Sequence, residues 1–157
     1  MTLPPLYHLH PMLVHFPIAL LVCGASLVIV DRLVTWRAPQ ALARALPWLG
    51  STERLLIVLG TLAAWAAVAT GHLAHDTAPH VPNAWEVLAE HEEYGETTAM
   101  AGTAYALWLL FAAPRIKNQL LVRGIDWVAT LLILILVIRT GHLGAQLVFI
   151  YGVGQSG

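Results

Sequence analysis

The sequence predicts an all-α fold, an integral membrane four-helix bundle built from two pseudo-repeated helical hairpins. Three observations lead to this fold class. Hydrophobic residues make up 58% of the 157 residues and charged residues 11%, whereas charged residues are about a quarter of a typical soluble protein. Four stretches are each long and apolar enough to cross a bilayer as a helix, which takes about twenty residues. The same four letters, Thr-Gly-His-Leu, close two of them, at residues 70–73 and 140–143.

We expect residues 1–157 to form a single transmembrane domain, with spans near 12–30, 55–73, 97–113 and 127–143. The first span begins after Pro11, which is tolerated in the opening turn of a helix. Pro17 is expected to bend its outer end, because proline removes one helical hydrogen bond. The second span is preceded by residues 51–53 (Ser-Thr-Glu), which are plausible capping residues.

The other two spans have their own boundary signals. The third is expected to end at Pro114, and the fourth to start just after Gly124. Asp126 would then lie in the first turn of the fourth helix, where a carboxylate is stabilised by the positive end of the helix dipole. Residues 39–49, in the loop after the first span, are interpreted as a short amphipathic helix on the inner membrane surface.

The loops predict the orientation. Loops 31–54 and 114–124 contain arginine and lysine, so the positive-inside rule places both in the cytoplasm. Loop 74–96 has no arginine or lysine and carries six carboxylates. We therefore expect a multi-pass protein of the bacterial cytoplasmic (inner) membrane with both termini in the periplasm. Lipid is the expected partner, and a net charge of −1 gives no indication of nucleic-acid binding.

The internal repeat predicts equal depth for two histidines. Arg54 to His72 and Arg123 to His142 have nearly the same length, roughly 27 to 28 Å at 1.5 Å per residue. We interpret the chain as two hairpins related by an approximate twofold axis along the membrane normal. The repeat is not strict, because the position of His75 corresponds to alanine in the second copy.

All eight histidines fall on the predicted outer side: His8, His10, His15, His72, His75, His80, His91 and His142. His15 is expected to agree in depth with His72 and His142, while His10 and His91 lie a turn or two further out. A spacing of five residues turns His10 and His15 about 140° apart on a helix. We therefore expect His15 to point into the bundle and His10 to lie at the rim with His91.

A cluster of imidazoles at one end of a bundle indicates a haem site. A b-type haem needs two axial imidazoles and no attachment motif, and the Cys-x-x-Cys-His motif of covalent attachment does not occur. Gly71 and Gly141 would let a flat macrocycle approach the backbone. One or two haem b groups are expected; the iron-ligand candidates are, in order of preference, His15, His72, His91 and His142, and then His10 and His75.

Arg139 is the expected partner of a haem propionate, because it shares a helix face with His142. Glu93 or Glu96 would serve equally as its partner, and so would lipid headgroups. Trp65 and Trp108 lie in mid-span and are interpreted as packing residues, with the edge of a quinone or haem as the alternative.

Two other functions use the same histidines. His72 and His75 lie one turn apart, and with Asp76, Glu90 and Glu93 they would form a copper- or zinc-binding site. A structural subunit would use the histidines to hold helices together or to dock a partner. No catalytic residue is identified, and HExxH is missing. The favoured interpretation is a membrane electron-transfer protein, closer to an electron carrier than to a stand-alone enzyme.

The sequence also resembles a known family. The opening HPMLVHFPIAL (residues 10–20), the Thr-Gly-His at 70–72, the closing TGHLG (140–144) and YGVG (151–154) are similar to the bacterial membrane family known as domain of unknown function 2231. The resemblance implies a four-helix membrane domain that occurs alone or joined to cytochrome c modules. It therefore implies a place in respiratory electron transfer. A c-type cytochrome or a quinone is the expected partner of an electron carrier of this kind, and a homo-oligomer or a larger complex is an open alternative to a single chain. Ala145 departs from the family pattern, in which a second glycine is common.

Overall fold

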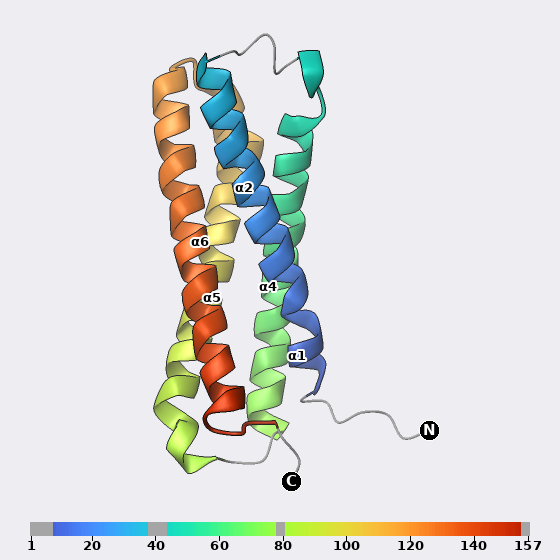
Figure 1. Cartoon of the computed structure of the whole chain (residues 1–157), viewed down its shortest axis with the longest axis vertical. Helices are drawn as coiled ribbons and strands as arrows, with labels where there is room; N and C mark the ends of the chain where they lie inside the picture. Colours follow the sequence, from blue (N-terminus) through green and yellow to red (C-terminus); the bar gives the residue numbers. More distant parts are fainter. Residues whose placement is uncertain (1–7, 38–43, 78–80, 155–157) are drawn as a thin grey trace, which may run out of the picture.

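A computed structural model describes residues 8–37, 44–77 and 81–154, which form a bundle of long helices (Figure 1). The helices are α1 (Leu9–Leu13), α2 (His15–Arg37), α4 (Leu49–Thr77), α5 (Trp85–Leu107) and α6 (Gln119–Phe149). Helix α1 continues the line of α2, so the long helices make four antiparallel rods. No strand occurs in the described part of the chain. The predicted all-α bundle is confirmed.

Pro17 explains why the first rod is two helices. A proline cannot donate to the carbonyl four residues earlier, and its ring clashes with that carbonyl. The carbonyl concerned belongs to Leu13, and α1 ends at Leu13. Val14 N–H donates to the His10 carbonyl over 3.1 Å, so the rod stays nearly continuous across the break. The predicted bend is therefore a one-residue interruption.

Two predicted helix starts are wrong. Helix α6 begins at Gln119, because the Asn118 side chain accepts hydrogen bonds from the backbone N–H groups of residues 120 and 121. Asp126 is therefore not in the first turn. Helix α4 begins at Leu49, so Glu53 is not a cap either. Asp126 and Glu53 are 0% and 1% exposed, because both lie on inward faces of the bundle, where they contact Arg32.

Three helical stretches are long and apolar enough to cross a membrane: Leu9–Thr35, Leu49–Thr77 and Gln119–Phe149. The predicted span 97–113 is not among them. Helix α5 carries carboxylates in its first half, and its α-helical part ends at Leu107. A π-helical turn, Trp108–Ala112, and a short 3-10 turn, Ala113–Arg115, follow it. Part of the predicted surface helix 39–49 lies outside the described residues, and residues 46–48 are not helical.

Each long helix turns one stripe of residues toward the centre, with steps of three and four residues. Such a stripe is the packing seam of coiled-coil-like bundles. The inward positions are 10, 14, 17, 21, 25, 28 and 32 on the first rod; 53, 57, 60, 64, 67 and 71 on α4; 91, 95, 98, 102, 105 and 109 on the third rod; and 126, 130, 133, 137, 140 and 144 on α6. The core cluster lies in the middle of these stripes, around Leu21, Ile57, Tyr105 and Ile133.

Glycines on or beside the stripes let the helices approach closely. A Cβ added to Gly60 would lie 2.9 Å from the Leu21 side chain, and one added to Gly24 would lie 3.0 Å from Ile57. Close backbone approach through glycine is typical of membrane helices. The opposite faces carry large apolar side chains, among them Ile135 and Ile138, which are 63% and 69% exposed. An outward apolar face of this kind suits lipid better than water.

Every stripe also begins or ends with a polar group. At one end of the bundle lie His10 and His91, which we call the histidine end. At the other lie Arg32, Glu53 and Asp126, which we call the carboxylate end. Fourteen residues separate Glu53 from Ala67, which touches His10, and this corresponds to about 21 Å along α4. The apolar core fills the space between the two ends.

Candidate functional site

The histidine end encloses a cavity of about 490 Å³ between the first rod, α4, α5 and α6. Its walls are mainly apolar and come from all four rods, including Val14, Ile18, Val68, Leu88, Leu147 and Val148. Ligand sites are commonly clefts of about 300 to 1,000 Å³ with apolar walls and a few polar groups placed among them. The polar groups of this cavity are chiefly histidines, among them His10, His75 and His91.

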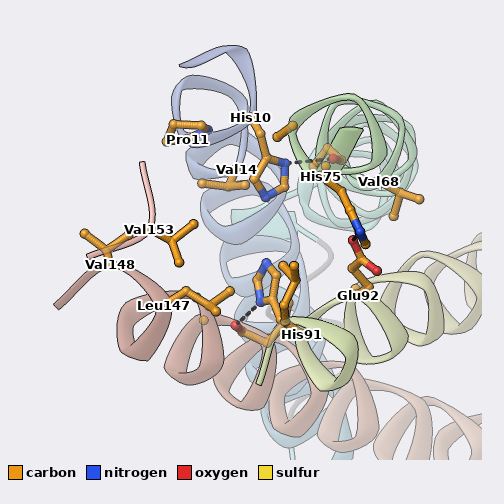
Figure 2. Close-up of a pocket in the computed structure, with 18 of the residues that line it drawn as sticks. His10, Pro11, Val14, Val68, His75, His91, Glu92, Leu147, Val148 and Val153 are labelled. Carbon is orange, nitrogen blue, oxygen red and sulfur yellow. Dashed lines mark hydrogen bonds and ion pairs between the residues drawn. The ribbon is translucent and has the colours of Figure 1, made fainter. Parts of the chain in front are cut away.

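His10 and His91 point toward one another across the cavity (Figure 2). Their ring centroids are 6.0 Å apart and the ring planes are inclined by 81°. His10 is the second residue of α1, and His91 lies in the second turn of α5. The two rings therefore come from different hairpins, 81 positions apart in the chain.

Both rings are held by a backbone carbonyl on the facing helix. His10 Nδ1 lies 2.9 Å from the Ala67 carbonyl oxygen, and His91 Nδ1 lies 3.0 Å from the Thr140 carbonyl oxygen. A carbonyl oxygen can only accept, so Nδ1 of each ring carries the proton. In a neutral imidazole the lone pair is then on Nε2. Anchoring one ring nitrogen to a carbonyl is the usual way in which proteins orient a metal-binding histidine.

The surroundings of His91 favour its neutral form. His91 precedes the third predicted span, and it is partly buried against α6. Burial, and then the neighbouring His10 ring, lower the pKa of the His91 imidazole, because both disfavour a positive charge at that position. A neutral His91 has a free Nε2 lone pair at neutral pH.

A glycine lies behind each ring. A Cβ added to Gly71 would lie 3.2 Å from His10 Cε1, and one added to Gly144 would lie 3.1 Å from His91 Cε1. Both distances are tighter than ordinary contact, so a side chain at either glycine would push on the ring. The predicted glycine pair was Gly71 and Gly141, but a Cβ on Gly141 would meet nothing within 4 Å. The glycine that supports His91 is therefore Gly144.

The second helices of the two hairpins, α4 and α6, are equivalent at an offset of 73 residues, not 70. The carbonyls that hold the rings are 73 positions apart (Ala67 and Thr140), and so are the glycines behind the rings. Glu53 and Asp126, at the carboxylate end, have the same separation. The two copies of Thr-Gly-His-Leu are 70 positions apart. They therefore differ by three residues, nearly one helical turn, from the positions that the packing makes equivalent. The repeated histidines are therefore not the inward ones.

Three of the preferred ligand candidates are exposed and do not belong to the facing pair. His15 is exposed, and the expectation that it points into the bundle is wrong. His72 borders the cavity, but its side chain is 54% exposed and contacts Glu96 over 3.0 Å. His142 is also exposed and hydrogen-bonds to Gln146 on its own helix. His72 is one residue past Gly71, and one residue turns a side chain about 100° around the helix.

On the first rod, His10 points into the bundle and His15 points outward, which is the reverse of the prediction. His10 and His15 do face different directions, as a spacing of five predicts. His10 is the inward residue, because it continues the buried stripe through Val14, Pro17 and Leu21. His10 and His91 are also not a turn or two further out than the Thr-Gly-His segments: their partners, Ala67 and Thr140, lie within or just before those segments. Following the stripe backward in the sequence would have found His10.

The other candidates form pairs of their own. His75 Nδ1 lies 2.6 Å from Glu92 Oε1, and the pair borders the same cavity (Figure 2). Arg139 pairs with Glu90 over 3.1 Å and lies over the Tyr94 ring, at 5.5 Å from its centroid. Arg139 is not among the residues that line the cavity. His80 lies outside the described residues.

Within the described ranges, no three His, Cys, Asp or Glu side chains are placed to hold one metal ion together. The proposed set of His72, His75 and nearby carboxylates is thus not assembled: His72 contacts Glu96 and His75 contacts Glu92. The indole N–H of Trp108 donates to Asp126 at the carboxylate end, and that of Trp65 donates to Thr103 on α5.

A family model described as "Predicted membrane protein (DUF2231)" matches residues 7–157. The chain belongs to this family. The match includes every described helix, so the cavity and its two inward histidines are part of the DUF2231 domain itself. No curated protein and no solved structure matches the chain.

Proposed function

We propose that this DUF2231 protein binds one b-type haem between His10 and His91 and uses it to transfer electrons at the outer face of the bacterial inner membrane. The observation that carries the proposal is the pair of facing imidazoles, each with Nδ1–H bonded to a carbonyl of the neighbouring helix. This arrangement leaves two Nε2 lone pairs for one iron.

The ring spacing supports a shared metal centre. Imidazole nitrogens bind metals at about 2.0 to 2.1 Å. Two rings on opposite sides of one ion therefore have centroids about 6.2 Å apart, since a ring centre lies roughly 1.1 Å behind its nitrogen. The observed separation is 6.0 Å. The rings are thus already at the distance that two axial ligands need.

The number of ligands favours haem over a bare ion. Zinc and copper sites in proteins usually take three or four protein ligands, and the described residues bring no such set together. A porphyrin supplies four of the six ligands of its iron itself, so two histidines suffice. The apolar walls of the cavity suit the macrocycle, and the one facing pair supports one haem instead of two.

The expected role follows from the coordination. If His10 and His91 both held the iron of a haem, the iron would have no open position for a substrate, which would suit an electron carrier. The basic loops at residues 31–54 and 114–124 support an orientation with both termini in the periplasm. The cavity would then lie at the periplasmic side, within reach of a quinone in the bilayer or a c-type cytochrome outside it.

Absorption spectroscopy tests the proposal. The full chain is produced in haem-sufficient cells, purified in detergent, and measured oxidised and after dithionite reduction. We expect the bands of a six-coordinate low-spin haem. His10→Ala and His91→Ala should each abolish or shift these bands, and added imidazole should partly restore them. His15→Ala is the matched control, because it removes an exposed imidazole from the same rod.

Two outcomes would contradict the proposal in different ways. A colourless preparation would exclude haem, and metal analysis of the same sample would then show whether copper or zinc is bound. Bands that survive in both His10→Ala and His91→Ala would show that haem binds elsewhere in the protein.

A further inference from the structure

The carboxylate end of the bundle places one cation against three carboxylates. Arg32 on α2 contacts Asp31 beside it, Glu53 on α4 over 3.2 Å and Asp126 on α6 over 2.7 Å. The Arg32 side chain is 15% exposed, and those of Glu53 and Asp126 are 1% and 0% exposed. Arginine keeps its proton in proteins. With all three acids ionised, the cluster would hold two uncompensated negative charges.

Asp126 has the hydrogen bonds that an ionised carboxylate needs. Its Oδ2 accepts from Arg32 Nε over 2.7 Å. Its Oδ1 accepts from the Trp108 indole N–H over 2.9 Å and lies 3.4 Å from the Tyr105 hydroxyl. Charge-assisted bonds of this kind stabilise the anion. Asp126 is therefore the acid that the structure stabilises in its charged form.

Glu53 has far less support. Its Oε1 has a single contact, with Arg32 over 3.2 Å, and its Oε2 is buried without a hydrogen-bond partner. A buried ionised oxygen without a donor is among the most costly groups that a protein can hold. A buried neutral carboxyl costs much less, because burial penalises the charge above all.

We propose that Glu53 is a proton-binding site, at which the carboxylate end holds a dissociable proton on the Glu53 carboxyl. The proton leaves one excess charge in the cluster instead of two. The groups that face it are Asp31 and Arg32 from α2 and, through Asp126, Tyr105 from α5. Asp126 remains ionised and keeps Arg32 in place.

The proton exchanges from the carboxylate end. Asp31 and Arg32 retain 15% exposure each, so they connect the cluster with the adjoining surface. Toward the histidine end, the apolar cluster around Leu21 and Ile57 separates the two sites, and along α4 they are about 21 Å apart. The proton site is therefore independent of whether the cavity binds haem.

Infrared spectroscopy of the cofactor-free full chain tests the proposal. At neutral pH we expect the carbonyl-stretching band of one protonated carboxyl, which shifts in deuterated water and disappears reversibly as the pH is raised. Labelling with ¹³C-glutamate should shift the band, whereas labelling with ¹³C-aspartate should leave it in place. This comparison needs no mutant and separates Glu53 from the two aspartates of the cluster.

Substitution gives a second measurement. Glu53→Gln should remove the band completely while the thermal midpoint stays equal or rises, because glutamine has the shape of the neutral acid. Glu90→Gln, at an exposed carboxylate, is the matched control and should keep the band. Absence of the band in the unmodified protein at neutral pH would overturn the proposal. So would its persistence in Glu53→Gln, a shift with labelled aspartate, or loss of the band on adding sodium or potassium, which would identify a metal-cation site instead.

Discussion

The two ends of the bundle are built on the same pair of hairpins but differ in what they leave free. At the histidine end, the rings of His10 and His91 each bond to a backbone carbonyl, and their other ring nitrogens face a cavity. At the carboxylate end, the polar side chains bond to one another, and Arg32 occupies the centre. One end thus leaves ring nitrogens facing a cavity, while the other already contains its own counter-ion.

Symmetry explains part of this difference. The twofold-related residues His10 and His91 both find a carbonyl, so both are held in the same way. The twofold-related acids Glu53 and Asp126 compete for a single arginine. Asp126 also accepts hydrogen bonds from the Trp108 indole and the Tyr105 hydroxyl, whereas Glu53 accepts neither. A nearly symmetric scaffold therefore gives an equal pair at one end and an unequal pair at the other.

Removing Arg32 should have the largest effect. Arg32→Met leaves buried carboxylates without their cation, which we expect to cost about 3 to 5 kcal/mol of unfolding free energy. Arg54→Met, at an exposed arginine nearby in the chain, is the control and should change little. Thermal unfolding in detergent measures both. Equal midpoints for the two variants would mean that the cluster does not hold the bundle together.

Removing both inward histidines should cost less. In the haem-free protein, His10→Ala with His91→Ala loses two hydrogen bonds to backbone carbonyls, each contributing about 1 kcal/mol. The same unfolding assay should therefore show a smaller loss than Arg32→Met. A loss as large as that of Arg32→Met would show that the histidine end is a structural brace and not a prepared ligand site.

Filling the space behind one ring should weaken the site selectively. Gly144→Ala places a Cβ 3.1 Å from His91 Cε1, and overpacking of this kind costs about 1 to 3 kcal/mol. We expect haem binding about tenfold weaker, measured by titration of the haem-free protein. Gly124→Ala, on the same helix with nothing within 4 Å, should bind normally. If the two variants bound haem with equal affinity, close contact between Gly144 and the His91 ring would not matter for the site.

Arg139 should have the smallest effect. Its pair with Glu90 is largely exposed, at 42% and 51%, and such pairs contribute about 0.2 to 1 kcal/mol. Arg139→Gln is expected to leave the haem spectrum and redox potential unchanged, because Arg139 does not line the cavity. A clear change in potential would instead support Arg139 as a propionate partner.

Much of the fold could be predicted from local chemistry. Composition predicts the helical membrane bundle, and Pro17 predicts the interruption of the first rod, because a missing N–H acts on the carbonyl four residues away wherever the helix lies. The start of the fourth helix was predicted too late, just after Gly124, whereas the Asn118 side chain caps the helix that begins at Gln119. Local signals determined the helices, with errors of several residues at their ends.

The inward histidines could have been predicted only in part. The stripe that contains Leu21, Ala25 and Val28 leads back to His10 by steps of three and four, and this signal is present in the sequence. The Thr-Gly-His-Leu repeat was a stronger signal and pointed to His72 and His142. Identical letters show common spacing in sequence, but they do not show which turn of the helix faces the centre.

The sequence by itself determined that this is a helical membrane protein with histidines gathered at one end, because hydropathy and local spacing depend on neighbouring residues alone. Only the tertiary structure decided that His10 meets His91, and that Arg32 selects Asp126, 94 positions away. These pairings depend on how far one hairpin slides along the other. The packing relates α4 to α6 at an offset of 73 residues, whereas the repeated Thr-Gly-His-Leu has an offset of 70, so the repeat alone does not identify the facing imidazoles.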